Sequence, residues 1–194
     1  MPVLSVVGAP GVGKSLLVKQ LATRALCPAF FEGEEGTIPA EILEKVFSDP
    51  DPVHRFSYFV DRYITNLTRA HQISELGLTV YVDGGVLSME AMLRYEDQGY
   101  RSALEDVVAR ARGLESHLTV LLVSQEEVLA TRIKNRGRST EGHDAAIARS
   151  VAIQNRFQEV ASEKQHVITI DCTHLSFFSE SDLATVDEQI RMAL

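Results

Sequence analysis

The chain has 194 residues, of which 45% are hydrophobic and 24% charged, and it carries a formal net charge of −8. This balance is that of an ordinary globular domain with a real core, which excludes a disordered, fibrous or collagen-like protein. The negative charge repels polyanions at long range, so a general DNA- or RNA-binding protein is disfavoured, although a local basic cleft for phosphates is not.

The compartment is indicated by what the sequence lacks. Its apolar runs, such as residues 118–123, are too short to cross a bilayer, so we expect no membrane association. The N-terminus has no basic region followed by an apolar stretch and a cleavage site. Cys27 and Cys172 form no metal-binding pattern and are expected to be free, partly buried thiols in a reducing compartment. We therefore expect a cytoplasmic protein.

The first half of the chain alternates short apolar runs with helical patterns. A long helix is predicted over residues 53–75, because its apolar residues recur at spacings of three and four. The apolar residues of this stripe are Phe56, Phe59, Val60, Tyr63, Ile64 and Leu67. The other predicted elements are a strand at 3–7, a helix at 15–26, a strand at 29–32, a loop at 33–39, a helix at 40–47 and a strand at 78–82.

The second half continues the alternation. Ser124 with Glu127 three residues later resembles a capping box, which predicts a helix that starts at Ser124 and runs to about 135. The remaining predictions are helices at 86–97, 102–112, 144–162 and 182–193, strands at 118–123 and 167–170, and a basic loop at 136–142. Alternating strands and helices predict a single α/β domain over residues 1–194, with a parallel sheet of about five strands covered on both faces.

A glycine-rich segment between the first strand and the first helix matches the phosphate-loop pattern in full. Glycines let successive backbone N–H groups turn toward an anion, and the helix adds its N-terminal N–H groups and its dipole. We expect Lys14 to reach the β- and γ-phosphates of ATP and Ser15 to ligate Mg²⁺. The predicted ATP-binding residues here are Gly8, Ala9, Pro10, Gly11, Val12, Gly13, Lys14 and Ser15.

Two acidic residues follow predicted strands, where ligands of open α/β sheets bind. Asp83 is expected to be the acid on the magnesium side, although an aspartate before Gly84 could simply form a turn. Glu32 is a candidate general base for an attacking hydroxyl, although Glu34 and Glu35 lie close by and leave the choice of acid open.

A cationic segment follows the helix that begins near residue 124, in a protein that is otherwise acidic. Planar guanidinium groups suit the clamping of a phosphoryl group, and a lid over ATP would exclude water. We predict that Arg132, Arg136 and Arg138 form such an arginine lid and act in catalysis, with Arg136 and Arg138 also binding ATP. A solvated basic helix end is the alternative interpretation.

In motif order along nearly the whole chain, the sequence resembles the deoxynucleoside kinases, within the broader group of P-loop kinases that includes thymidylate kinases. The motifs are the loop at 8–15, the acid after the second strand, the strand end at Asp83 and the arginine lid. The resemblance implies that Glu32 is the base on the sugar hydroxyl and that the lid arginines grip the phosphates. It also implies that Arg69 corresponds to the helix arginine of the family and, like Phe59 and Tyr63, binds the substrate.

Two departures concern the acceptor half of the site. Gly84-Gly85 stands where family members have an arginine and a serine, and Val60 stands where they have a base-reading glutamine after a phenylalanine. Phe59 and Tyr63, with Phe56, could line a base pocket, or the stripe could simply be core. The primary expectation is a kinase of a (deoxy)nucleoside 5′-hydroxyl that uses ATP and Mg²⁺.

Two alternatives change the acceptor and a third changes the class of protein. The acceptor could be a nucleoside monophosphate, or a 5-hydroxymethyl pyrimidine within DNA if arginines formed a local basic groove. A non-kinase P-loop NTPase module is the third. A homodimer could form through apolar residues of the helix at 86–97. The arginines named for the groove are Arg55, Arg62, Arg69 and Arg94, and the apolar residues are Leu87, Met89, Met92 and Leu93.

Overall fold

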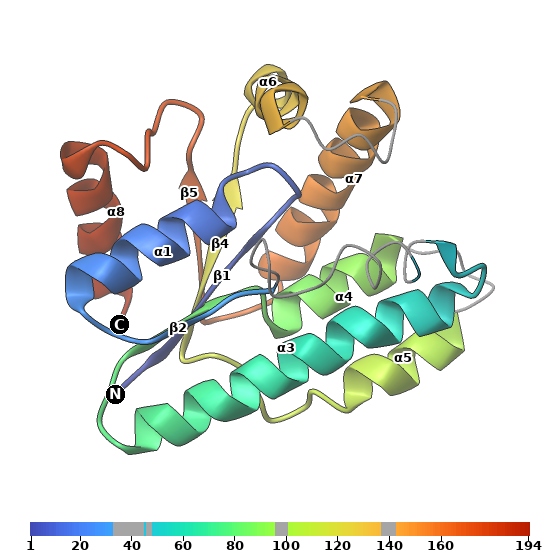
Figure 1. The fold of residues 1–194 in the computed structure, drawn as a ribbon, viewed down its shortest axis with the longest axis horizontal. Coiled ribbons are helices and arrows are strands. Elements are labelled where there is room, and N and C mark those ends of the chain that lie inside the picture. The colour runs from blue at the N-terminus through green and yellow to red at the C-terminus, as the bar shows by residue number, and fades with distance from the viewer. Residues whose placement is uncertain (33–44, 46–47, 96–100, 137–142) are drawn as a thin grey trace.

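The computed structural model describes residues 1–32, 45, 48–95, 101–136 and 143–194. Five strands in this part of the chain form one sheet in the order β2-β3-β1-β4-β5, and every pairing is parallel (Figure 1). This confirms the predicted α/β class and the five-stranded parallel sheet. The strands are β1 (Val3–Gly8), β2 (Ala29–Phe30), β3 (Val80–Asp83), β4 (Leu118–Val123) and β5 (Val167–Asp171).

Helices cover both faces of the sheet, as Figure 1 shows. α1 and α8 pack on one face, α3, α4, α5 and α7 form the layer on the other, and α6 follows the carboxyl end of β4. A parallel sheet covered in this way is expected from its continuous apolar strands. The helices are α1 (Lys14–Ala25), α3 (Pro52–Glu75), α4 (Val86–Tyr95), α5 (Arg101–Ala109), α6 (Glu126–Arg136), α7 (His143–Ala161) and α8 (Glu180–Ala193).

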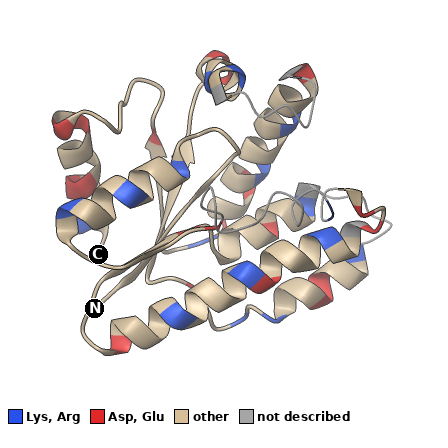
Figure 2. Cartoon of the chain, in the orientation of Figure 1, with Lys and Arg blue, Asp and Glu red and all other residues tan. Residues whose placement is uncertain are grey.

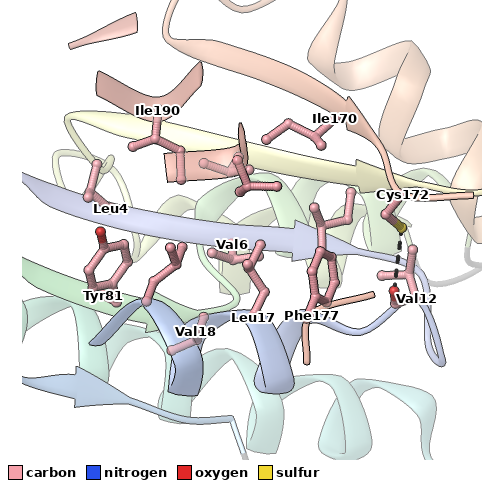
Figure 3. Packing of buried hydrophobic residues seen from close by; sticks show 14 of the residues in the cluster. Leu4, Val6, Val12, Leu17, Val18, Tyr81, Ile170, Cys172, Phe177 and Ile190 are labelled. Atoms are coloured by element: carbon pink, nitrogen blue, oxygen red, sulfur yellow. Dashed lines mark hydrogen bonds between the residues drawn. The ribbon is translucent and has the colours of Figure 1, made fainter. Parts of the chain in front are cut away.

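The central strand β1 separates two halves of the core, because successive side chains of a strand point to opposite faces. Leu4 and Val6 pack with α1 and α8, in the cluster drawn in Figure 3. Val3 packs with α3, and Val7 packs with α4 and α7. In the parallel register Val6 lies beside Asp83 of β3, so Gly8 and Asp83 end at the same edge of the sheet.

The long helix α3 confirms the predicted buried stripe. Asp51 caps its N-terminus by accepting a hydrogen bond of 2.8 Å from the backbone N–H of Val53. Phe56, Tyr63 and Leu67 are each at most 3% exposed. The helix therefore packs one apolar face on the sheet. Its polar residues Arg62 and Asn66 lie at the edge of the sheet beside β2.

The predicted capping box at Ser124 is wrong. α6 begins at Glu126, two residues later, and the Ser124 side-chain oxygen is buried with no partner among the described residues. The reason is a long-range contact. The side-chain amide of Gln154 in α7 binds both the N–H of Ser124 (3.0 Å) and its carbonyl oxygen (2.9 Å), which holds the Ser124 backbone in the segment between β4 and α6.

Several other expectations can be compared with the structure. Cys27 and Cys172 are free thiols, as expected. Of the four apolar residues named for a dimer, Leu87 and Met89 are core residues, at most 5% exposed, and a homodimer stays a prediction. The described part of the chain contains no helix both long and apolar enough to cross a membrane. The predicted loop at 33–39, most of the helix at 40–47 and most of the basic loop at 136–142 lie outside the described residues.

Candidate functional site

The loop between β1 and α1 has a shape that only glycine permits at its critical positions. Gly8 has a φ of 146°, and a Cβ added there would lie 2.6 Å from the backbone oxygen of Leu122. Gly13, with a φ of 111°, directly precedes the first residue of α1. The loop therefore runs close to the sheet and opens at a helix N-terminus, where unsatisfied N–H groups favour an anion.

Lys14 begins α1 and reaches back over this loop. Its Nζ donates a hydrogen bond of 3.3 Å to the backbone oxygen of Ala9, and the residue is only partly buried. The same cation lies near enough to Glu32 to lower the pKa of that carboxyl. One ammonium group thus stands between the predicted phosphate site and the predicted base.

Ser15 and Asp83 meet, as expected of two residues that serve the same metal. The hydroxyl of Ser15 donates a hydrogen bond to Oδ2 of Asp83, which is 1% exposed. The other carboxylate oxygen, Oδ1, is buried and has no hydrogen-bond partner within the described residues. An unpartnered buried carboxylate oxygen beside a hydroxyl fits Mg²⁺, a hard cation that takes one or two protein oxygens and completes its shell with water and phosphate.

Glu32 lies two residues beyond β2, on a segment that α3 holds by its backbone. Nε of Arg62 donates a hydrogen bond of 2.7 Å to the carbonyl oxygen of Glu32. Nδ2 of Asn66, one helical turn later, donates one of 3.0 Å to the carbonyl oxygen of Phe31. Glu32 itself stays partly exposed, so a ligand can reach it.

The Glu32 carboxyl has an environment typical of a general base. Burial raises its pKa, the Lys14 cation lowers it, and the negative charge of Asp83 raises it again, so that the net direction is upward. Bases are effective when their pKa approaches the working pH. Burial, together with Glu32, raises the pKa of the Tyr63 hydroxyl well above its usual range, so Tyr63 is a neutral donor.

Of the three predicted substrate residues, one reaches this site. Tyr63 lies beside Glu32 and Gly84. Phe59 is partly buried against the core formed by α3, α4 and α5 and packs edge-on against Tyr58, with ring centroids 5.5 Å apart. Arg69 is exposed on α3, seven residues beyond Arg62 and hence on the order of 10 Å further along the helix axis.

The departure at Val60 has a simple structural cause, because the residue is 1% exposed and belongs to the core. Sequence reasoning missed Asn66 and the backbone role of Arg62. Their spacing of four on a helix, flanking the buried stripe, was the available signal.

Arg132 is engaged by protein atoms on two sides. Its Nη1 donates to the carbonyl oxygen of Val12 (3.1 Å) and contacts Sγ of Cys172 (3.3 Å), and its Nη2 donates to the carbonyl oxygens of Cys172 (2.9 Å) and Leu175 (3.3 Å). The Cys172 thiol also reaches the Val12 carbonyl, as Figure 3 shows. Arg132 therefore ties the loop at 8–15 to the segment after β5, and its catalytic role stays a prediction. Arg138 and the side chain of Arg136 lie outside the described residues.

Two of the four arginines named for a basic groove, Arg62 and Arg94, contact protein atoms. Arg94 pairs with Glu163, two residues beyond α7, at 2.5 Å, and Arg62 donates a hydrogen bond to the carbonyl oxygen of Glu32. Figure 2 shows Lys and Arg interspersed with Asp and Glu along the helices. A DNA acceptor stays a prediction.

The fold, but no sequence family, is shared with known proteins. No family model and no curated protein matches the chain. Among solved structures, deoxyadenosine kinase from M. mycoides with the products dCMP and dCDP superimposes with a TM-score of 0.72 at 15% identity, over 98% of this chain and 99% of the other. The same enzyme with bound dATP gives 0.67 at 14% identity, over 98% of this chain and 100% of the other.

Thymidylate kinase from Ehrlichia chaffeensis gives a TM-score of 0.63 at 12% identity, over 98% of this chain and 97% of the other. Chains this distant in sequence share a fold, and function has to be argued from the site itself. The five-stranded sheet with its flanking helices is thus the fold of P-loop nucleoside and nucleotide kinases.

Proposed function

We propose that this chain is an ATP-dependent kinase that transfers the γ-phosphoryl group to the 5′-hydroxyl of a nucleoside, with Mg²⁺ as cofactor. The observation that carries the proposal is the meeting of three groups at one edge of the sheet. Lys14 of the phosphate loop, the Ser15–Asp83 pair and the partly buried carboxyl of Glu32 influence one another there. The shared fold of nucleoside and nucleotide kinases supports the same conclusion.

Each part of the site has a separate role in phosphoryl transfer. Backbone N–H groups of the loop and the N-terminus of α1 bind the phosphates, and Lys14 offsets the charge of the β- and γ-phosphates. Ser15 and Asp83 would hold Mg²⁺, which would supply positive charge to offset the negative charge of the phosphates. The acceptor oxygen forms a bond to the γ-phosphorus, the bond from that phosphorus to the β-bridging oxygen breaks, and the hydroxyl proton passes to Glu32.

The charges around Glu32 favour a neutral hydroxyl over a phosphate as the acceptor. Two carboxylates, Glu32 and Asp83, face this region, and Gly84-Gly85 contributes no cation after β3. A monophosphate dianion placed here would be repelled by both carboxylates, whereas a neutral hydroxyl would donate its hydrogen bond to Glu32. These contacts support a nucleoside as the substrate.

An acceptor panel with γ-labelled ATP and Mg²⁺ tests the proposal. It contains deoxynucleosides, their monophosphates, and DNA oligonucleotides with plain or 5-hydroxymethyl pyrimidines, and the Lys14→Ala protein serves as the blank. We expect label on free nucleosides, and a fall of roughly 100-fold or more in the Glu32→Gln protein, the scale of general base catalysis.

Other labelled products identify the alternatives. Label on a monophosphate or on DNA alone overturns the nucleoside assignment, and roughly 100 mM added salt would suppress transfer to DNA strongly but transfer to a nucleoside only slightly. Release of labelled inorganic phosphate with no labelled acceptor would identify an NTPase module.

A further inference from the structure

The sheet does not hold the Glu32 carboxylate in place. β2 pairs with β3 at only two positions, Ala29 with Tyr81 and Phe30 with Val82, and Glu32 lies two residues beyond the last pair. Arg62 and Asn66 fix the backbone of this segment, as described above. Neither contact restrains the side-chain torsions of Glu32, so the direction of its carboxylate needs a separate cause.

Tyr63 supplies that cause from the same turn of α3. Its hydroxyl lies close enough to the Glu32 carboxylate to lower the pKa of that carboxyl, and the Ser88 hydroxyl at the start of α4 lowers the pKa of Tyr63 in the same way. Both Tyr63 and Ser88 are 3% exposed, so water has little access to these two hydroxyls. The chain Ser88–Tyr63–Glu32 joins α4, α3 and the end of β2.

The Tyr63 ring is itself held by the backbone after β3. A Cβ added at Gly84 would lie 2.1 Å from Cε1 of Tyr63, so the ring occupies the space that any other residue at position 84 would fill. Gly84 directly follows Asp83. The ring of Tyr63 therefore lies between the end of β3, which carries Asp83, and the carboxylate of Glu32. A buried ring clamped in this way has little rotamer freedom, which makes its hydroxyl a fixed donor.

We propose that Tyr63 is the positioning residue of Glu32: its hydroxyl, held by Ser88 and lodged over Gly84, sets the direction in which the carboxylate meets the acceptor. The inference rests on the proposed function in that Glu32 acts there as the base. A base is effective only within hydrogen-bonding reach of the proton that it removes, so a misdirected carboxylate lowers turnover more than it lowers substrate binding.

The Tyr63→Phe variant tests the proposal, because it removes one hydroxyl and keeps the ring on Gly84. We expect kcat for nucleoside phosphorylation to fall about 10-fold or more, and KM for ATP to change less than about 2-fold. Tyr58→Phe is the matched control, since Tyr58 lies on the same helix, is partly buried and packs against Phe59. It should leave both constants within about 2-fold of the wild type.

A double-mutant cycle separates positioning from a general structural effect. If Tyr63 acts through Glu32, then Tyr63→Phe should lower kcat no further in the Glu32→Gln protein. An equal fall in both backgrounds would overturn the proposal. So would a Tyr63→Phe protein with wild-type kcat.

A spectroscopic readout keeps the two proposals distinguishable if no nucleoside is phosphorylated. The chain has five tyrosines, and ¹³C labelling at the phenol carbon gives one resonance for each. The Tyr63 resonance, assigned by its loss in Tyr63→Phe, should shift in Glu32→Gln while that of Tyr58 stays in place. If the Tyr63 resonance shifts but the protein phosphorylates no nucleoside, the proposed function is wrong and the contact between Tyr63 and Glu32 is retained. An unmoved Tyr63 resonance would overturn the positioning role.

Discussion

Replacing Gly84 with alanine should destabilise the protein by more than its backbone angle explains. Gly84 has a φ of 93°, in the left-handed region that side chains disfavour by about 1–2 kcal/mol. In addition, the new methyl group would lie 2.1 Å from Cε1, 2.9 Å from Cδ1 and 3.0 Å from Cζ of Tyr63. Tyr63 is buried and cannot move aside freely, so overpacking adds about 1–3 kcal/mol.

The two contributions together lower the free energy of unfolding by about 2–5 kcal/mol. For a domain of this size, each 1 kcal/mol lowers Tm by about 2–4 °C. Thermal unfolding followed by circular dichroism should therefore show a loss of at least about 4 °C, and urea unfolding should give the corresponding shift of the midpoint.

Gly77→Ala is the matched control. Gly77 has a φ of 86°, and a Cβ added there would meet nothing within 4 Å, so this variant carries only the backbone strain. If Gly84→Ala and Gly77→Ala lower Tm by the same amount, Tyr63 does not fill the space over Gly84, and the positioning argument loses its geometric basis.

Three further changes probe other contacts. Arg132→Ala removes charged hydrogen bonds between the phosphate loop and the segment after β5, so it should lower the free energy of unfolding by about 1–3 kcal/mol in urea titrations. Lys134→Ala, an exposed cation on the same helix, should change it by less than about 0.5 kcal/mol. Nδ1 of His117 accepts a hydrogen bond from the N–H of Val3, and burial lowers the pKa of His117, so the unfolded chain binds this proton first. The free energy of unfolding should therefore fall as the pH drops below 6.5, the ordinary pKa of histidine. Urea midpoints measured at pH 7.5 and 5.5 should differ less in His117→Phe than in the wild type. An equal difference in the two proteins would contradict this role of His117. Burial raises the pKa of Glu32, so its ionised form opposes folding at neutral pH and Glu32→Gln should raise Tm while it lowers phosphoryl transfer; a lower Tm would contradict the assigned environment.

Much of the fold could be predicted because local patterns carry it. The strand at 118–123 was predicted with its observed bounds, and the buried face of α3 followed from its periodicity. The phosphate loop and the meeting of Ser15 with Asp83 followed from motif and topology, since the carboxyl ends of parallel strands share one edge.

The parts that could not be predicted depend on contacts between residues far apart in sequence. Ser124 fits a local capping pattern, yet Gln154, thirty residues later, binds its backbone and displaces the helix start. Arg132 was expected to face phosphates, and contacts forty residues away engage its guanidinium. Local propensity contains no information about such partners.

The acceptor side shows the same limit. Gly84 looked like the loss of an arginine, and only the packing of Tyr63 against it reveals what occupies that space. Tyr63 itself fitted a helical core stripe equally well, because the stripe and the site share one face of α3.

The most direct test of the central claim is a crystal structure with Mg²⁺, a non-hydrolysable ATP analogue and a deoxynucleoside bound together. We expect the phosphates on the loop at 8–15, with the metal beside Ser15 and Asp83. The nucleoside 5′-oxygen should lie about 2.6–3.2 Å from the Glu32 carboxylate, with the Tyr63 hydroxyl beside the same carboxylate. A nucleoside bound elsewhere, or a Glu32 carboxylate turned away from its hydroxyl, would contradict the assignment of this edge of the sheet as a nucleoside kinase site.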